Sequence, residues 1–154
     1  MTPAEFIMRL SKPAMESQIK SGVPACITIA QAALESGWGE SGLAKTGNNL
    51  FGIKADSRWR GDTLTLNTKE FIKGQWVVIP AKWRKYSSWQ ESIDDHSRFL
   101  RQNPRYQTFF LCQTTEAFAR ALVRAGYATD PGYAEKLMNL ISQHKLDLST
   151  KGAL

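Results

Sequence analysis

Glu35 is the residue whose position most clearly suggests chemistry. It ends a run of apolar residues, 25–34, and is followed by Gly37, where a helix is expected to stop. Thr28, Gln31 and Glu35 are three and four residues apart, so on a helix they form one polar stripe on an otherwise apolar cylinder. We expect such a helix to be buried. Burial disfavours the charged form of a carboxyl and raises its pKa, which makes Glu35 a candidate proton donor near neutral pH.

A structural role is the alternative for the same carboxylate. A glutamate in the last turn of a helix faces the negative end of the helix dipole, so helix stability does not explain its presence. A buried ion pair with an arginine or lysine elsewhere in the chain would explain it. The helix pattern alone therefore leaves both roles open.

A second acid, Glu70, lies in a predicted β-hairpin. Residues 64–72 and 76–86 are rich in β-branched and aromatic residues, and residues 73–75 between them are typical of a turn. Strand alternation places Glu70 on the face opposite Lys69. Glycoside hydrolysis needs one carboxylic acid to protonate the leaving oxygen, and often a second carboxylate. The alternative role for Glu70 is that of a solvent-facing strand residue.

Helices and a glycine-rich segment are predicted around these acids. A capping box, Thr2-Pro3-Ala4-Glu5, begins a helix that extends to residue 21, and Pro13 is expected to break or restart it. The helix that carries Glu35 is expected over 24–36. Six glycines between residues 37 and 61, without any apolar period, predict a long loop region of the kind that is usually functional.

The order of the elements predicts the fold class. Three further helices follow the hairpin, with expected N-caps at Ser88, at Thr114 or Thr115, and at Asp130. Helices, one inserted hairpin and more helices make an α+β fold, in which a mostly helical lobe and a small β-lobe at about 62–86 flank a substrate cleft. We expect one domain over 1–148 and a tail at 149–154.

The composition limits the classes of partner. The formal net charge is +6 and the pI is near 9.5, which favours an anionic partner such as nucleic acid, an anionic membrane surface or the bacterial cell wall. Arg98, Arg101 and Arg105 cluster near a predicted helix end, but no nucleic-acid motif accompanies them, so we interpret them as a solvated basic face. No run of about twenty apolar residues is present, so no stable membrane insertion is expected.

Metal and disulfide chemistry are not predicted. Cys26 and Cys112 are the only cysteines, and we expect both to be buried free thiols, a disulfide being the alternative. His96 and His144 have no companions at ligand spacing, so we expect no metal and no cofactor. The N-terminus lacks a charged-then-apolar pattern, which predicts synthesis in the cytoplasm without a signal peptide.

Several motifs, taken in order, resemble one enzyme family. They are AQAALESGWG at 30–39, NNLFGIKA at 48–55, WRG at 59–61, TKE at 68–70, YSS at 86–88, NPRY at 103–106 and AGYATDPGY at 125–133. The series is similar to glycoside hydrolase family 73, the glucosaminidase family of peptidoglycan hydrolases, over nearly the whole chain. Within the family it looks closest to the C-terminal enzyme domain of flagellar rod-associated hydrolases.

The resemblance implies a lysozyme-like fold and cleavage of the β-1,4 bond after N-acetylglucosamine in the glycan strands of peptidoglycan. By the same resemblance Glu35 is the catalytic acid, Glu70 matches a second glutamate of the β-lobe, and Tyr127 is a further catalytic residue. Two routes would complete the reaction. Water activated by Glu70 would give inversion of configuration at the sugar carbon, whereas attack by the acetamido group of the substrate near Tyr127 would give retention.

Five residues are expected to bind the sugar chain: Trp38, Asn49, Phe51, Trp59 and Tyr133. Asn49 and Phe51 belong to the motif that would line the floor between the lobes. The flat faces of tryptophans stack on sugar rings, and core packing is the alternative role for Trp38 and Trp59. Trp76 on the hairpin is a further candidate for stacking.

The resemblance also suggests a biological setting. Flagellar members of the family carry a preceding rod-binding domain, whereas this chain begins at the enzyme domain. We therefore expect a free-standing monomeric lysin that acts in the periplasm or cell wall: a phage or prophage endolysin released by a holin, or an effector injected by a secretion system. A muramidase or lytic transglycosylase on the same polymer, and a non-catalytic wall-binding module, are the alternative functions.

Overall fold

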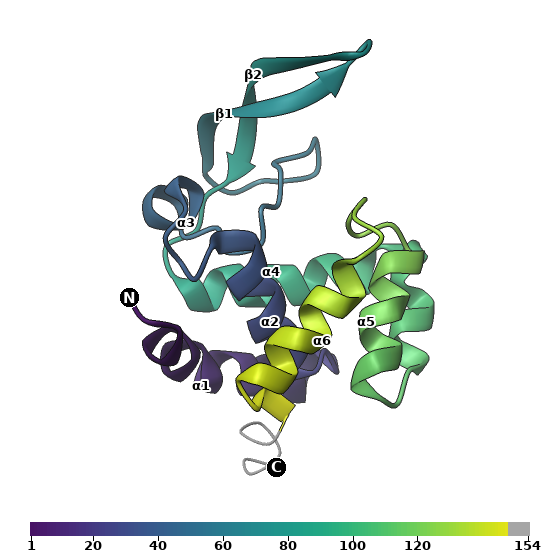
Figure 1. Ribbon diagram of the computed structural model, residues 1–154. Coiled ribbons are helices and arrows are strands. Elements are labelled where there is room, and N and C mark those ends of the chain that lie inside the picture. The colour runs from purple at the N-terminus through teal and green to yellow at the C-terminus, as the bar shows by residue number, and fades with distance from the viewer. Residues whose placement is uncertain (148–154) are drawn as a thin grey trace.

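The computed structural model describes residues 1–147 and has two lobes, a bundle of helices and a two-stranded hairpin that projects from it (Figure 1). The elements are α1 (Pro3–Ser21), α2 (Ala25–Ser36), α3 (Gly42–Gly47), β1 (Thr63–Ile72), β2 (Gln75–Arg84), α4 (Trp89–Gln102), the 3-10 helix η1 (Pro104–Leu111), α5 (Thr115–Arg124) and α6 (Tyr133–Gln143). The predicted α+β class, with a helical lobe and a small β-lobe, is confirmed. The predicted tail at 149–154 lies outside the described residues.

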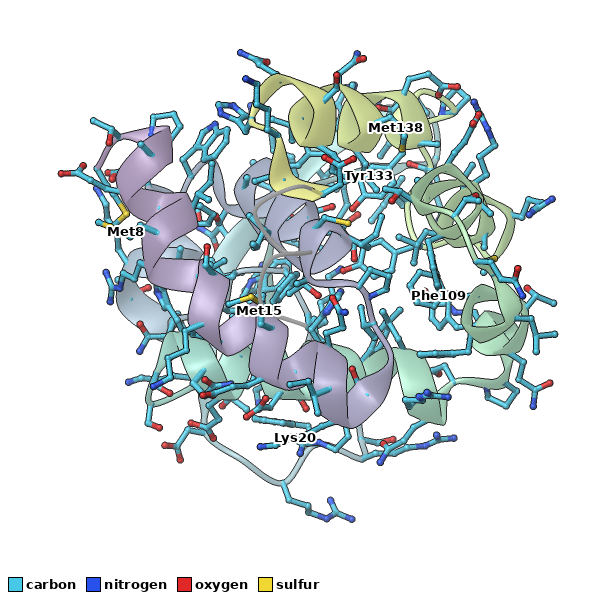
Figure 2. All side chains as sticks on the ribbon, turned by 90° about the horizontal axis from the view of Figure 1, so that it is seen from below. Met8, Met15, Lys20, Phe109, Tyr133 and Met138 are labelled. Carbon is cyan, nitrogen blue, oxygen red and sulfur yellow. The ribbon has the colours of Figure 1, made fainter. Side chains whose placement is uncertain are left out.

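Helix α2 is the centre of the helical lobe. It packs against α1, α5 and α6, and its apolar residues are buried on nearly every side, as the sequence predicts. Figure 2 views this lobe from below and shows Phe109 and Tyr133 inside the packed interior, with Met8 and Lys20 at its periphery. The burial of α2 fixes its C-terminal end, and therefore Glu35, relative to three other helices.

Helix α1 begins at the predicted capping box. The Thr2 hydroxyl accepts a hydrogen bond from the backbone N–H of Glu5, and the Glu5 carboxylate accepts one from the backbone N–H of Thr2. The predicted break at Pro13 is wrong, because α1 is one helix from Pro3 to Ser21. Proline removes only one backbone donor, and buried residues on both sides of it, Leu10 and Ala14, hold the two halves against the core.

The segment predicted as a loop over 37–61 contains one short helix, α3. The Ser41 hydroxyl accepts from the backbone N–H of Ala44 and caps this helix. Only six residues are helical, too few to produce an apolar period in the sequence. The rest of the segment is irregular and leads from the helical lobe to β1 (Figure 1).

The hairpin has the predicted strands and turn. β1 and β2 pair antiparallel from Thr63–Arg84 to Ile72–Gln75. The turn residues Lys73 and Gly74 both have positive φ, 52° and 79°, which is the backbone of a type I′ turn and matches the twist of the strands. Residues on the two faces of β1 alternate between half-buried and exposed, and Glu70 is on the half-buried face.

The helices after the hairpin differ from prediction in two places. η1 was not predicted, because Asn103-Pro104 ends α4 and starts a 3-10 helix at once. Asp130 does not cap α6: its carboxylate accepts from the backbone N–H of Gly132, which is itself the N-cap. The Ser88 and Thr114 caps are confirmed.

Two further sequence expectations are tested by the fold. Cys26 and Cys112 are free thiols, but only Cys26 is buried; Cys112 is half-buried at the end of η1, so its predicted burial is wrong. Within residues 1–147, no helix has the length and apolar character needed to cross a bilayer.

Candidate active site

A cleft of about 340 Å³ lies where the C-terminal end of α2 faces the base of the hairpin. Its walls come from α2, the segment before β1, the end of β2, α4, η1 and the loop before α6. The lining residues are Glu35, Phe51, Gly52, Ile53, Lys54, Asp56, Arg84, Phe99, Arg105, Tyr106 and Tyr127. Three of the predicted site residues, Glu35, Phe51 and Tyr127, therefore meet in one cleft.

Glu35 is presented to this cleft by the way α2 ends. Gly37 takes a left-handed conformation, with φ of 56°, and stops the helix one residue after Ser36. The helix is buried as predicted, and the Glu35 side chain at its end is exposed to the cleft. The surrounding protein still removes enough water to raise its pKa, while a hydrogen bond from Tyr133 opposes that rise.

A chain of hydrogen bonds runs from Glu35 into the core. The Tyr133 hydroxyl lies 3.0 Å from Glu35 Oε1, Gln31 Nε2 lies 3.0 Å from that hydroxyl, and His96 Nε2 lies 2.9 Å from Gln31 Oε1. Gln31 and His96 are completely buried and Tyr133 nearly so. The chain joins α2, α6 and α4 and fixes one oxygen of the carboxyl.

The donors in this chain all point toward Glu35. An amide oxygen only accepts, so His96 must carry its proton on Nε2. The Gln31 amide then donates to the Tyr133 oxygen, and the tyrosine proton is left for Glu35 Oε1. Burial lowers the pKa of His96 to about 3, so the ring is neutral and no positive charge stabilises the Glu35 carboxylate from behind.

The sequence did not predict the role of His96, which was interpreted as an isolated histidine. Its ring stacks on Phe51, with centroids 3.9 Å apart, and so also supports the floor of the cleft. Two sequence signals point to its position: it lies three residues after buried Ile93 on α4, and Gln31 on the polar stripe of α2 needs a buried partner. Thr28, the third residue of that stripe, is buried, and its hydroxyl bonds to none of the described residues.

Tyr127 lies in an aromatic cluster at the cleft. Its ring is stacked with that of Tyr133, at 6.0 Å, and meets Tyr106 and Phe99 at 6.2 and 6.4 Å. Burial, followed by the nearby Tyr133 and Glu35, raises its pKa well above the usual value. The phenol is therefore neutral and available as a hydrogen-bond donor beside the acid.

Glu70 does not line the cleft in this structure. Its carboxylate pairs with Lys54 Nζ at 2.9 Å, and Lys54 is a lining residue. The ion pair therefore connects the half-buried face of the hairpin to the rim of the cleft. Both side chains are partly exposed, at 35% and 54%, so the pair holds the hairpin only weakly.

Two of the predicted sugar-binding residues are placed elsewhere. Trp38 follows the left-handed Gly37 and has positive φ itself, 60°, which turns its ring onto Phe6 and His144, away from the cleft lining. Asn49 is 1% exposed, and its amide bonds to backbone atoms of Ile53 and Arg84. Trp38 and Asn49 therefore do not line this cleft, and their contact with substrate stays a prediction; Asn49 shapes the segment that carries Phe51.

Tyr133 and Trp59 complete the predicted set. Tyr133 is 3% exposed and its hydroxyl donates to Glu35, so it contacts the acid; its predicted contact with sugar stays a prediction. Trp59 lines a second hollow that shares Asp56, Arg84 and Phe99 with the cleft. Its indole N–H donates to the backbone oxygen of Asp62 and one ring face meets the Arg84 guanidinium at 4.8 Å.

The base of the hairpin is anchored by a buried ionic group. Arg84 Nη1 lies 2.9 Å from Asp95 Oδ2, and the Tyr86 hydroxyl donates to the same oxygen at 2.6 Å. Asp95 is on α4, so this group ties the end of β2 to the helical lobe. Sequence reasoning did not identify it, because the three residues come from separate elements and match no local motif.

The three arginines that were predicted to form a solvated basic face line different hollows. Arg105 lines the cleft, Arg98 lines the hollow of Trp59, and Arg98 and Arg101 line a third hollow between α1 and α4. Within residues 1–147, no three His, Cys, Asp or Glu side chains are placed to hold a metal ion. Acid–base chemistry by Glu35 is what the described groups of the cleft provide.

A fixed acid of raised pKa in an open cleft between a helical lobe and a hairpin is what general-acid cleavage of a sugar chain requires, and the class is that of lysozyme-like glycoside hydrolases. The chain belongs to the Glucosaminidase family, mannosyl-glycoprotein endo-beta-N-acetylglucosaminidase, whose profile matches residues 11–146. The resemblance to glycoside hydrolase family 73 is thereby confirmed.

Individual relatives agree with this assignment. Peptidoglycan hydrolase FlgJ of Escherichia coli K12 is 43% identical over 144 residues, 91% of this chain and 46% of that protein. Exo-glucosaminidase LytG of Bacillus subtilis is 42% identical over 147 residues, 92% of this chain and 51% of that protein. A C-terminally truncated glycoside hydrolase domain of Salmonella typhimurium FlgJ superimposes with a TM-score of 0.78 at 42% identity, covering 94% of this chain and 99% of that one. The chain spans about half the length of the curated relatives it matches.

Proposed function

We propose that this glycoside hydrolase is an endo-β-N-acetylglucosaminidase that cleaves the β-1,4 bond after N-acetylglucosamine in peptidoglycan. The observation that carries the proposal is Glu35, an acid of raised pKa held by Tyr133 at the open end of a buried helix. Peptidoglycan as the substrate is supported by the names of the FlgJ relatives. The net charge of +6 suits the anionic cell wall.

The hydrogen bond from Tyr133 decides which oxygen of Glu35 reacts. Oε1 accepts a hydrogen bond from the Tyr133 hydroxyl, so Oε2 is the oxygen that carries the transferable proton. Glu35 Oε2 gives this proton to the glycosidic oxygen as the bond from C1 to that oxygen breaks. The leaving sugar departs as an alcohol, C1 becomes oxocarbenium-like, and Glu35 becomes a carboxylate that later accepts a proton from the attacking water.

For the second half of the reaction we favour attack by the 2-acetamido group of the substrate. Its carbonyl oxygen bonds to C1 and forms a cyclic intermediate, which water then opens with net retention. Tyr127 supports this route because it lies beside Glu35 and keeps its phenol proton, so it can orient the acetamido group. The alternative, in which Glu70 activates water with inversion, needs the hairpin to move Glu70 from Lys54 into the cleft.

Mass spectrometry of fragments released from purified sacculi tests the function. We expect new reducing ends of N-acetylglucosamine, no anhydro sugars, and long fragments early in the digest, as endo-cleavage requires. Reducing N-acetylmuramic acid would identify a muramidase instead, and anhydro-N-acetylmuramic acid a lytic transglycosylase. Early release of short terminal fragments would overturn the endo mode in favour of the exo-activity for which LytG is named.

Glu35→Gln tests the role of the acid. We expect a loss of about 10²–10⁴ in kcat, because the amide has no proton to donate. Glu16→Gln is the matched control, since it neutralises an exposed glutamate on α1 that pairs with Lys12, and it should retain full activity. Undiminished clearing of sacculi by Glu35→Gln would overturn the catalytic assignment and favour a wall-binding module.

The predicted role as an endolysin, or as an injected effector, stays a prediction. Expression of the chain in a bacterial host with and without a holin tests whether it can act as an endolysin: we expect lysis only when the holin is present. A purified chain that sediments as a monomer would agree with the predicted oligomeric state.

A further inference from the structure

The outer end of the hairpin exposes a cluster of apolar side chains. Phe71, Trp76 and Val78 are 61%, 72% and 61% exposed, and the Phe71 and Trp76 rings lie 5.3 Å apart across the strands. A cross-strand aromatic pair beside a turn stabilises a hairpin, but that role does not need Val78. Single exposed apolar residues need no explanation, whereas a contiguous patch at the end of a projecting element usually marks a binding surface.

This cluster lies on the face of the hairpin that points away from the active-site cleft. Phe71 pairs with Trp76 and Lys69 pairs with Val78, so all four are on one face. Glu70 is on the opposite face, where its carboxylate reaches Lys54 at the rim of the cleft. A glycan held beside Glu35 therefore does not cover the cluster.

The cluster is surrounded by positive charge. Lys69 and Lys82 are on the same face, and Lys73 is in the turn. Glu70 is the only acidic residue in the sequence from 63 to 84, and Lys54 already pairs with it. The outer patch, defined as Lys69, Phe71, Lys73, Trp76 and Val78, thus combines aromatic and aliphatic groups with unbalanced lysines.

We propose that the outer patch binds peripherally to an anionic phospholipid surface. Tryptophan and other apolar side chains partition into the headgroup region, and lysines beside them are attracted to anionic lipids. A second copy of the chain fits poorly, because two such patches would bring their lysines together. The hairpin projects from the helical lobe, so its end can reach a flat surface that the helices do not touch (Figure 1).

Co-sedimentation with lipid vesicles tests this binding. We expect the chain to bind vesicles that contain phosphatidylglycerol, to bind vesicles of pure phosphatidylcholine at least tenfold more weakly, and to be released as salt rises. Trp76→Ser/Val78→Ser should abolish binding. Lys69→Gln/Lys73→Gln, which keeps the apolar groups, should weaken it at least tenfold, since each lysine near an anionic membrane contributes about fivefold.

Matched variants separate the outer patch from the rest of the surface. Leu111→Ser removes an apolar side chain that is 79% exposed on the helical lobe, and Lys12→Gln/Lys20→Gln removes two charges from α1; neither should change vesicle binding. The two lysine double variants and Leu111→Ser should cleave soluble glycan fragments as well as the unaltered chain does, which separates this inference from the proposed function. No binding to anionic vesicles, equal binding by the outer-patch variants, or concentration-dependent dimerisation abolished by Trp76→Ser/Val78→Ser would each overturn the proposal.

Discussion

The Tyr133 hydroxyl donates a hydrogen bond of 3.0 Å to Glu35 Oε1, although the two residues are 98 positions apart in the sequence. Tyr133 can donate only in this direction, because its oxygen already accepts from the Gln31 amide. The bond favours the charged form of Glu35 and so opposes the rise in pKa that loss of water causes. Two opposing influences on one carboxyl therefore set the pH range in which it holds a proton.

Replacing Tyr133 with phenylalanine tests this balance. Removing the donor should raise the pKa of Glu35 further, so the loss of activity at high pH, where the acid is deprotonated, should move to higher pH. The carboxyl also becomes less well oriented, and we expect kcat to fall about tenfold to a hundredfold. The measurement is kcat/KM against pH for the variant and the unaltered enzyme.

Tyr86→Phe is the matched control for that experiment. It removes a phenol that donates to Asp95, not to Glu35. Tyr133→Phe leaves the buried Gln31 amide without its acceptor, and Tyr86→Phe removes one of the two hydrogen bonds to Asp95 Oδ2. Each variant should cost about 1–3 kcal/mol of stability. Only Tyr133→Phe should shift the pH profile. An unshifted profile, or the same shift in both variants, would show that Tyr133 does not act on the pKa of Glu35.

His96 should make the protein less stable as the pH falls. The pKa of the folded histidine is about 3, below the ordinary value of 6.5, so between these values the unfolded chain binds more protons than the folded one. Stability contributed by neutral His96 is therefore complete above pH 6.5 and declines toward pH 3, by up to about 1.4 kcal/mol per pH unit. Carboxylates titrate over part of the same range.

Urea unfolding at several pH values isolates this contribution. His96→Gln has no titrating ring, so its free energy of unfolding should change less between pH 7 and pH 4.5 than that of the unaltered chain. A variant and a parent with parallel pH dependence would contradict the burial of a neutral histidine. Loss of the catalytic pH optimum in His96→Gln would further show that the chain through Gln31 orients the acid.

Local patterns in the sequence predicted the elements that present Glu35. The apolar character of α2 and the stop at Gly37 are properties of consecutive residues, and both are confirmed. The hairpin and its turn follow equally from alternation and from the glycine at 74. The prediction failed at Pro13, where burial of the neighbouring turns of α1 outweighs the loss of one backbone hydrogen bond.

The residues of the hydrogen-bond chain that leads to Glu35 were harder to predict from the sequence. Tyr133 was expected to bind sugar, and its hydrogen bond to Glu35 was not predicted. His96 was judged isolated because its partner, Gln31, is 65 residues away. Such contacts depend on how helices pack, and a motif specifies residue types but not which side chain faces which.

Asp95 should be essential for the position of the hairpin. It is the acceptor for both Arg84 and Tyr86, and the Arg84 and Asp95 side chains are only 10% and 5% exposed. Asp95→Ala leaves a buried guanidinium without its closest acid and should lower the free energy of unfolding by about 3–5 kcal/mol. Asp94→Ala, one residue earlier, removes a hydrogen bond from Gln90 and should cost less than about 1 kcal/mol. Equal costs in urea unfolding would contradict the anchoring role.

Glu70 and Lys54 provide the test of the second half of the reaction. If the acetamido route operates, Glu70 acts only through its exposed ion pair with Lys54. Glu70→Gln and Lys54→Met should then each lower kcat/KM by about two- to fivefold. The double variant should be no worse than either, because both single changes break the same contact.

The stereochemistry of the product is an independent test of the same step. We expect the unaltered enzyme and Glu70→Gln both to release a sugar that has, when first formed, the β configuration. Proton NMR during the reaction measures this. If Glu70 activates water instead, the product is the α anomer, Glu70→Gln loses about a hundredfold or more in kcat, and Lys54→Met has a much smaller effect. A large loss in Glu70→Gln alone, together with inversion, would therefore replace Tyr127 with Glu70 as the partner of Glu35.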